Sequence, residues 1–178
     1  NDYTAYQESL QKAFTEWWNS LPENDGVDDN SVDMALLFLP GPKGLGGGTG
    51  RLAGAGGEIV GPPASSALKA LITAEAKEWG YTVVEHAKYN GDAHIAGKEI
   101  RIGISAGKAT WLEEFGHILD PNVRAGAARA GTARLAAETK IKLILINGAE
   151  KYGLPKVTVE GLRDTLDGYR RLHQQGRL

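Results

Sequence analysis

The stretch TWLEEFGHILD, residues 110–120, has the spacing of a helix with two different faces. At about 100° per residue, its apolar side chains share one arc, and its two glutamates and its histidine share the opposite arc. Glu113 and His117 are one helical turn apart, so both could reach one metal ion. Glu114 stands beside them, where a general base would lie next to a metal-bound water. A solvated surface helix is the alternative, because it shows the same division into faces.

Two further residues favour a functional site over a plain surface helix. Glycine inside a helix costs about 1 kcal/mol relative to alanine, so Gly116 indicates the close approach of another backbone. Glu138 lies on a largely apolar face of a second expected helix, residues 132–146. A carboxylate in such surroundings needs a partner, because an unpaired buried charge is very costly. That partner is either a metal ion or, in a surface salt bridge, Arg134 or Lys142.

Residues 113–117 match a metal-binding pattern at every position that defines it except the first. In the pattern H-E-x-x-H, two imidazoles one turn apart bind the ion and the glutamate between them is catalytic. Here Glu113 stands where the first histidine belongs, while Glu114 and His117 are in place. With the segments around it, the chain resembles the minimal gluzincin metallopeptidase domains that are frequent in phage and mobile-element proteins. The resemblance covers residues 66–172.

Three more segments carry this resemblance, in the order that the family has them. They are Ala76-Lys-Glu-Trp-Gly80-Tyr-Thr-Val83 as a first helix and strand, Lys98-Glu-Ile-Arg-Ile102 as an edge strand, and Arg134-Leu-Ala-Ala-Glu138 as the third-ligand helix. The resemblance implies an α+β, zincin-like fold, with a small antiparallel or mixed sheet packed on helices. It also implies peptide-bond hydrolysis by metal-activated water, on a peptide or protein substrate. By resemblance, His117 and Glu138 are metal ligands with Glu113 in the place of the first histidine, and Glu114 is the general base.

The glutamate at position 113 leaves several functions open. One imidazole with two carboxylates is a harder, more negative donor set, which suits Zn²⁺ and also Mn²⁺ or Fe²⁺. The first alternative is a catalytically degenerate relative that serves as a structural or protein-interaction module of a phage or mobile element. The second is a nucleic-acid or nucleotide-binding module, for which a locally basic region supplies the argument. Its basic residues are Arg124, Arg129, Arg134, Lys140 and Lys142.

Two weaker features complete the list of candidate sites. Residues 103–110 lie between a strand and a helix as a phosphate-binding loop would, but the spacing of their glycines and lysine departs from that motif. His94 lies in an expected hairpin and could supply the missing ligand, although an ordinary polar strand residue is the simpler interpretation. His86 and His173 are expected on the surface.

The chain is expected to have three parts. Residues 1–40 form an N-terminal helical segment, residues 41–63 a Gly/Pro-rich linker or loop, and residues 64–178 the zincin-like domain. An amphipathic helix is expected over residues 3–21, because its apolar residues recur at helical spacing. Such a helix, with Trp17 and Trp18 on it, is too apolar to stand alone, so it must pack on the main domain, on another subunit in an oligomer, or on a partner.

The remaining elements follow from periodicity and turn signals. Helices are expected from Ser65 or Ser66 to Trp79 and over 158–173, a strand over 81–85, and a hairpin pairing 93–95 with 99–104. Residues 122–131 have a weak helix tendency.

Composition excludes several classes of protein. The 178 residues carry a net charge of −2, so no overall basic field attracts nucleic acid or an anionic membrane. No apolar run approaches the length of a membrane span, and no signal peptide is visible, so a cytoplasmic protein is expected. There is no cysteine, so any metal must be held by His, Asp, Glu and water.

Overall fold

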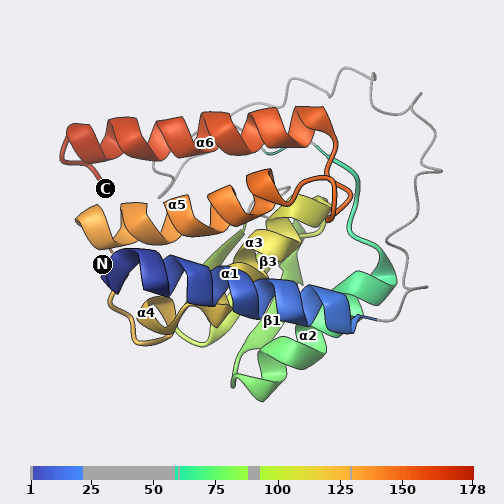
Figure 1. Ribbon diagram of the computed structural model, residues 1–178. Helices are drawn as coiled ribbons and strands as arrows, with labels where there is room; N and C mark the ends of the chain where they lie inside the picture. Colours follow the sequence, from blue (N-terminus) through green and yellow to red (C-terminus); the bar gives the residue numbers. More distant parts are fainter. Residues whose placement is uncertain (1, 22–58, 60, 88–92, 129) are drawn as a thin grey trace.

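The described residues combine helices with a small three-stranded sheet, in agreement with the expected α+β class. The computed structural model describes residues 2–21, 59, 61–87, 93–128 and 130–178. The expected apolar run at 34–39 and most of the 41–63 linker lie outside these residues. In order, the elements are α1 (Asp2–Ser20), α2 (Ser66–Glu78), β1 (Thr82–His86), β2 (Ala93–Ala96), β3 (Glu99–Gly103), α3 (Lys108–Leu119), α4 (Pro121–Arg124), α5 (Gly131–Asn147) and α6 (Lys156–Gln174). Figure 1 shows α5 and α6 lying side by side, with α3 beside the sheet.

The sheet is mixed and has the strand order β1-β3-β2. Residues 98–102, expected as an edge strand, therefore belong to the central strand, because β3 has a partner on both sides. β3 pairs in parallel with β1 and antiparallel with β2, so the expected hairpin is present. Gly97 turns this hairpin with φ 64°, a left-handed conformation that favours glycine. Ile100 and Ile102 are buried, because one face of the sheet packs toward α3.

Helix α2 begins as its sequence predicts. The Ser65 side chain accepts a hydrogen bond of 3.1 Å from the Leu68 backbone N–H, which satisfies one of the unpaired donors at the helix start. Leu68, Ile72 and Ala76 are buried on one face. The expected helix of residues 66–79 is therefore present, with Trp79 as its C-terminal cap.

Helix α1 packs its apolar face against the rest of the chain, as one of the three alternatives for it predicted. Leu10 and Phe14 are buried, and the Trp17 ring lies 4.1 Å from that of Phe115 on α3, centroid to centroid. Phe14 also meets Tyr152, at 5.3 Å between ring centroids. Aromatic pairs of this kind bury large apolar areas, so α1 is part of the core.

Helices α3 and α5 cross closely at Gly116. A Cβ atom at this position would lie 2.9 Å from Cδ1 of Ile141. The predicted close approach is therefore real, but a side chain and not a backbone makes it. The helix weakly expected over residues 122–131 is shorter in the structure, because α4 ends at Arg124 and Gly126 adopts a left-handed φ of 72°.

None of the described helices combines the length and the apolar content needed to cross a membrane.

Candidate functional site

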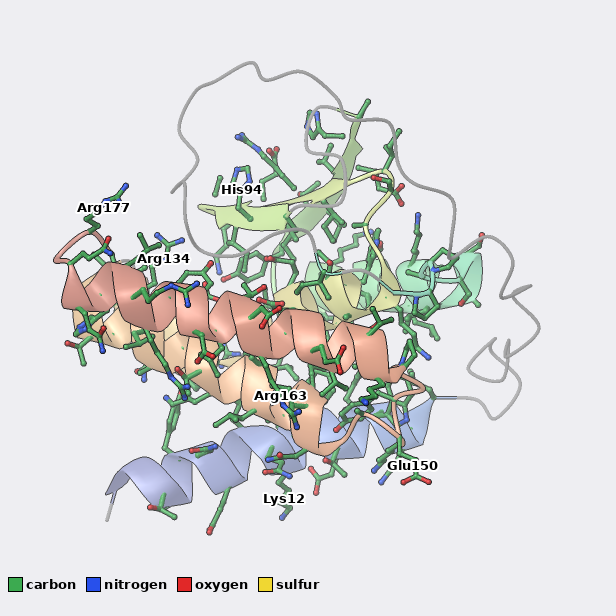
Figure 2. All side chains as sticks on the ribbon, turned by 90° about the horizontal axis from the view of Figure 1, so that it is seen from above. Lys12, His94, Arg134, Glu150, Arg163 and Arg177 are labelled. Carbon is green, nitrogen blue, oxygen red and sulfur yellow. The ribbon has the colours of Figure 1, made fainter. Side chains whose placement is uncertain are left out.

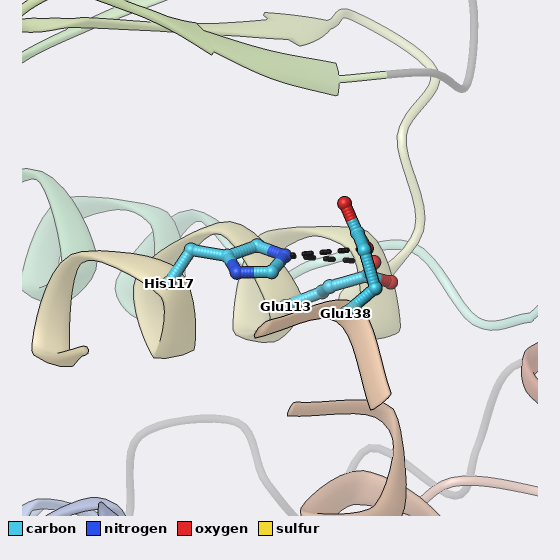
Figure 3. Close-up of side chains that lie close together, drawn as sticks. All are labelled: Glu113, His117 and Glu138. Atoms are coloured by element: carbon cyan, nitrogen blue, oxygen red, sulfur yellow. Dashed lines mark ion pairs between the residues drawn. The ribbon is translucent and has the colours of Figure 1, made fainter. Parts of the chain in front are cut away.

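Helices α3 and α5 bring together the three residues that the sequence predicts as metal ligands. His117 Nε2 lies 3.5 Å from Glu138 Oε2 and 4.0 Å from Glu113 Oε1. One donor atom from each residue lies within 4.8 Å of the other two (Figure 3). Considered as donors alone, these three side chains form a group that could hold a metal ion.

The polar face of α3 is buried, so its interpretation as a solvated surface helix is wrong. Glu113 and Glu114 are each 8% exposed, and His117 is 7% exposed. The two-faced helical pattern of the sequence could not show that the polar face is buried, because other parts of the fold cover the helix on both sides. Three ionisable groups on one buried face need compensation by other charges or protons.

Lys142 supplies that compensation. From one turn further along α5, its ammonium donates hydrogen bonds to Glu138 Oε2, at 2.8 Å, and to Glu113 Oε1. The side chain is fully buried, and its Nζ lies 4.9 Å from the centre of the Tyr169 ring on α6. Lys142 was considered only as a surface partner of Glu138, so the pairing was correctly anticipated but its burial and its second carboxylate were not.

The protonation states follow from these charges. Burial lowers the pKa of Lys142, but the carboxylates of Glu113 and Glu138 outweigh it, and the pKa rises well above its ordinary value. Burial likewise opposes the charge of Glu138, yet Lys142 and His117 hold its pKa well below the usual range. Burial also opposes the charge of His117, but the Glu138 charge and hydrogen bond raise its pKa to about 9. At neutral pH the site therefore holds an ammonium and an imidazolium.

Glu114 behaves differently from its neighbours. Burial raises its pKa to about 8, and the charges of Glu113 and Glu138 add to the effect, while His117 and Lys142 oppose it. At neutral pH its carboxyl is therefore protonated, whereas a general base must be ionised to accept a proton.

These side chains do not fit a metal ion as they stand. A ligating histidine must be neutral, and it almost always donates its second ring N–H to a carboxylate, a carbonyl or a water. The buried Nδ1 of His117 has no hydrogen-bond partner within the described part of the chain. Both carboxylate ligands are already bound to the Lys142 ammonium. The donor atoms suit a metal, but the fixed charge among them does not.

The other candidate histidines lie outside this group. His94 is exposed on β2, opposite Arg101 of β3, and Figure 2 shows it on the sheet, apart from α5 and α6. His173 lies 3.0 Å from the Thr132 hydroxyl, near the start of α5. Of the described residues, those of the metal-type group come from α3 and α5 alone.

Several side chains of the predicted basic region are used inside the protein. The Arg124 guanidinium donates to the backbone carbonyls of Ile118 and Leu119, and Lys142 belongs to the buried cluster. Lys140 is buried, with Nζ 3.7 Å from the centre of the Tyr6 ring. Arg129 lies outside the described residues. These contacts count against a nucleic-acid surface on this region, since phosphate contacts need exposed cations.

The phosphate-loop interpretation of residues 103–110 also loses support. The Lys108 backbone N–H, which would face a phosphate at the start of α3, donates to the Pro62 carbonyl at 2.8 Å. Pro63 and Gly107 form an isolated bridge beside it. A neighbouring chain segment therefore occupies the helix start.

Tyr169 is the component of the site that the sequence reasoning missed. It lies in α6, 27 positions after Lys142 in the chain, and its ring is also 5.6 Å from the Arg134 guanidinium carbon. Its only signal in the sequence is an aromatic residue on the strongly amphipathic last helix.

No protein-family model, curated protein or solved structure matches the chain. The functional argument therefore rests on the geometry of the site.

Proposed function

We propose that this protein is a zincin-like domain in which a lysine ammonium has replaced the catalytic metal, and that it serves as a structural or protein-interaction module. One observation carries the proposal: the buried Lys142 ammonium is hydrogen-bonded to both carboxylates of the metal-type group, on Glu113 and Glu138. The ammonium neutralises the same oxygens that a divalent ion would bind.

Electrostatics explains why the two cations exclude each other. At an effective dielectric constant of about 20, two unit positive charges 4 Å apart repel by about 4 kcal/mol, and a divalent ion doubles that value. A metal could enter only if Lys142 moved away or lost its proton. The two hydrogen bonds of the ammonium to Glu113 and Glu138 oppose the second route, and full burial against Tyr169 opposes the first.

Peptide hydrolysis is the second candidate function, and the grouping of Glu113, His117 and Glu138 supports it. The three side chains would hold the metal ion, and the metal ion would supply an activated water. Glu114 would then need to be ionised to act as the base. The Lys142 ammonium, bound to both carboxylates that would hold the metal, is the reason to place this function second.

Metal content tests the choice between the two functions. The full chain, purified without chelator, is offered Zn²⁺ or Mn²⁺ and analysed for bound metal. We expect none in the wild type and about one equivalent in Lys142→Met, because this variant removes the ammonium and keeps the donors. Lys151→Met is the matched control, since Lys151 is exposed, and it should bind none.

A second variant makes the result specific to the site. Adding His117→Ala to Lys142→Met should abolish the metal gained. One tightly held equivalent in the wild type, lost in His117→Ala, would contradict the proposal and favour the peptidase. A Lys142→Met protein that is folded and still binds no metal would show that the site has lost zincin geometry altogether.

A further inference from the structure

Tyr169 on α6 lies against the cation at the centre of the site. The centre of its ring is 4.9 Å from Lys142 Nζ and 5.6 Å from the guanidinium carbon of Arg134. Both cations belong to α5, about two turns of helix apart, and α6 packs along α5 (Figure 1). An aromatic ring within about 6 Å of a cation attracts it, and more strongly where water is excluded. The ring therefore acts on the Lys142 ammonium from a helix that carries none of the metal-type donors.

The carboxylates of the site do not by themselves favour a lysine over a metal. The oxygens of Glu113 and Glu138 accept hydrogen bonds from the ammonium. The same oxygens are ligands for a divalent ion, which would also gain the His117 nitrogen. Lysine has a long, flexible side chain and a strongly hydrated ammonium, so water competes for it. A contact that only the ammonium can use is needed to keep it in place.

The Tyr169 ring supplies such a contact. Its face attracts an ammonium, but it offers no nitrogen, oxygen or sulfur donor to a divalent ion. The ring also lies beside a Lys142 side chain that is only 1% exposed, so it helps to separate the ammonium from water. Specificity between two occupants is a difference of affinities, and the ring adds to the affinity for one of them.

We propose that Tyr169 is the positioning residue that keeps the Lys142 ammonium, and not a divalent ion, between the two carboxylates. The inference rests on the function proposed above, because it takes Lys142 as the resident cation. The aromatic ring carries the effect and the hydroxyl does not, so Tyr169→Phe should behave as wild type. In Tyr169→Leu the ammonium can move into the space of the ring, which frees the donors of Glu113, His117 and Glu138.

The position of Lys142 is tested first, in the full chain and without metal. Its acylation by acetic anhydride is followed by peptide mass spectrometry and compared with that of the exposed Lys151. A buried amine reacts through local opening, so loss of the ring contact should speed the labelling of Lys142 at least about tenfold in Tyr169→Leu. Tyr169→Phe should label at the wild-type rate, because it keeps the ring.

Zinc binding tests the selection between the two cations. Tyr169→Leu, titrated with Zn²⁺ and analysed for bound metal, should hold about one equivalent at least about tenfold more tightly than wild type or Tyr169→Phe. Leu172→Ala is the matched control, because Leu172 is buried on the same helix and its truncation loosens α6 without removing the ring. This control should gain neither metal nor labelling of Lys142.

The outcomes separate this inference from the proposed function. Zinc uptake by Lys142→Met but not by a folded Tyr169→Leu would overturn the role of Tyr169 and leave the proposed function standing. Equal labelling of Lys142 in Tyr169→Leu and Tyr169→Phe would overturn it as well. Absence of zinc from a folded Lys142→Met would count against the proposed function, while faster labelling in Tyr169→Leu would still support the positioning role. Tyr169→Met, which removes the ring and keeps most of its volume, replaces Tyr169→Leu if that variant does not fold.

Discussion

Removal of the Lys142 ammonium should destabilise the protein strongly. Coulomb's law with an effective dielectric constant of about 20 gives about 6 kcal/mol for the Lys142–Glu138 contact at 2.8 Å. Recovered hydration of the ammonium in the unfolded chain offsets several kcal/mol of this. Breaking a buried ion pair by removing one partner leaves a net loss of about 3–5 kcal/mol, and we expect that loss for Lys142→Met in the absence of metal.

Urea unfolding followed by tryptophan fluorescence measures this loss, since Trp18 and Trp111 are buried and report on the core. The control Lys151→Met, at an exposed position, should stay within about 0.5 kcal/mol of wild type. Adding Glu138→Gln to Lys142→Met should recover about 1–3 kcal/mol, because the second change removes an uncompensated buried charge. If Lys142→Met unfolds at the same urea concentration as the Lys151 control, the ammonium does not hold the carboxylates and the reasoning fails.

Three further predictions test other parts of the structure. Glu114 has a pKa raised to about 8 from 4.5, so its contribution to stability is complete below pH 4.5 and is lost at up to about 1.4 kcal/mol per pH unit as the pH rises to 8. Urea unfolding at pH 5 and pH 8 should therefore show a larger loss for wild type than for Glu114→Gln, and equal losses would refute the raised pKa. Gly116→Ala should destabilise by about 1–3 kcal/mol despite the better helix propensity of alanine, and Ile141→Val should relieve it, as a double-mutant cycle would show. Tyr6→Phe removes a hydrogen bond to the buried Asp120 and should cost about 1–3 kcal/mol, measured as a lower urea midpoint; an unchanged midpoint would mean that water replaces the hydroxyl.

Local sequence signals were enough to predict most helices, whereas the meeting of α3 with α5 was expected from the family resemblance. The Ser65 cap, the apolar spacing along α1 and the hairpin around Gly97 each act within a few residues, which is why periodicity and turn chemistry detect them. The order of the strands depends on which edge each strand pairs with, and no local pattern encodes that choice. The place of β3 between a parallel and an antiparallel neighbour therefore appeared only in the structure.

The chemistry of the site was harder to predict than its position. Glu138 and Lys142 are four residues apart, and on an isolated helix that spacing describes an ordinary exposed ion pair. Burial changes its meaning, because α3 brings Glu113 to the same ammonium and α6 brings Tyr169 over it. Burial favours the protonated form of Glu114, whereas the Glu138 carboxylate favours the protonated form of His117 against the effect of burial. The donor residues can thus be predicted from sequence, whereas the charge that fills the space between them cannot.

The contacts of α1 have a consequence for how the protein is made. Tyr6 and its hydrogen-bond partner Asp120 are 114 positions apart in the chain, and Phe14 and its ring partner Tyr152 are further apart still. During synthesis α1 leaves the ribosome before any of these partners exist. Its aromatic face must stay exposed or be held by a chaperone until α3 and the residues after α5 have emerged. The core therefore closes late, as one long-range event, and folding should be slow for a chain so rich in helix.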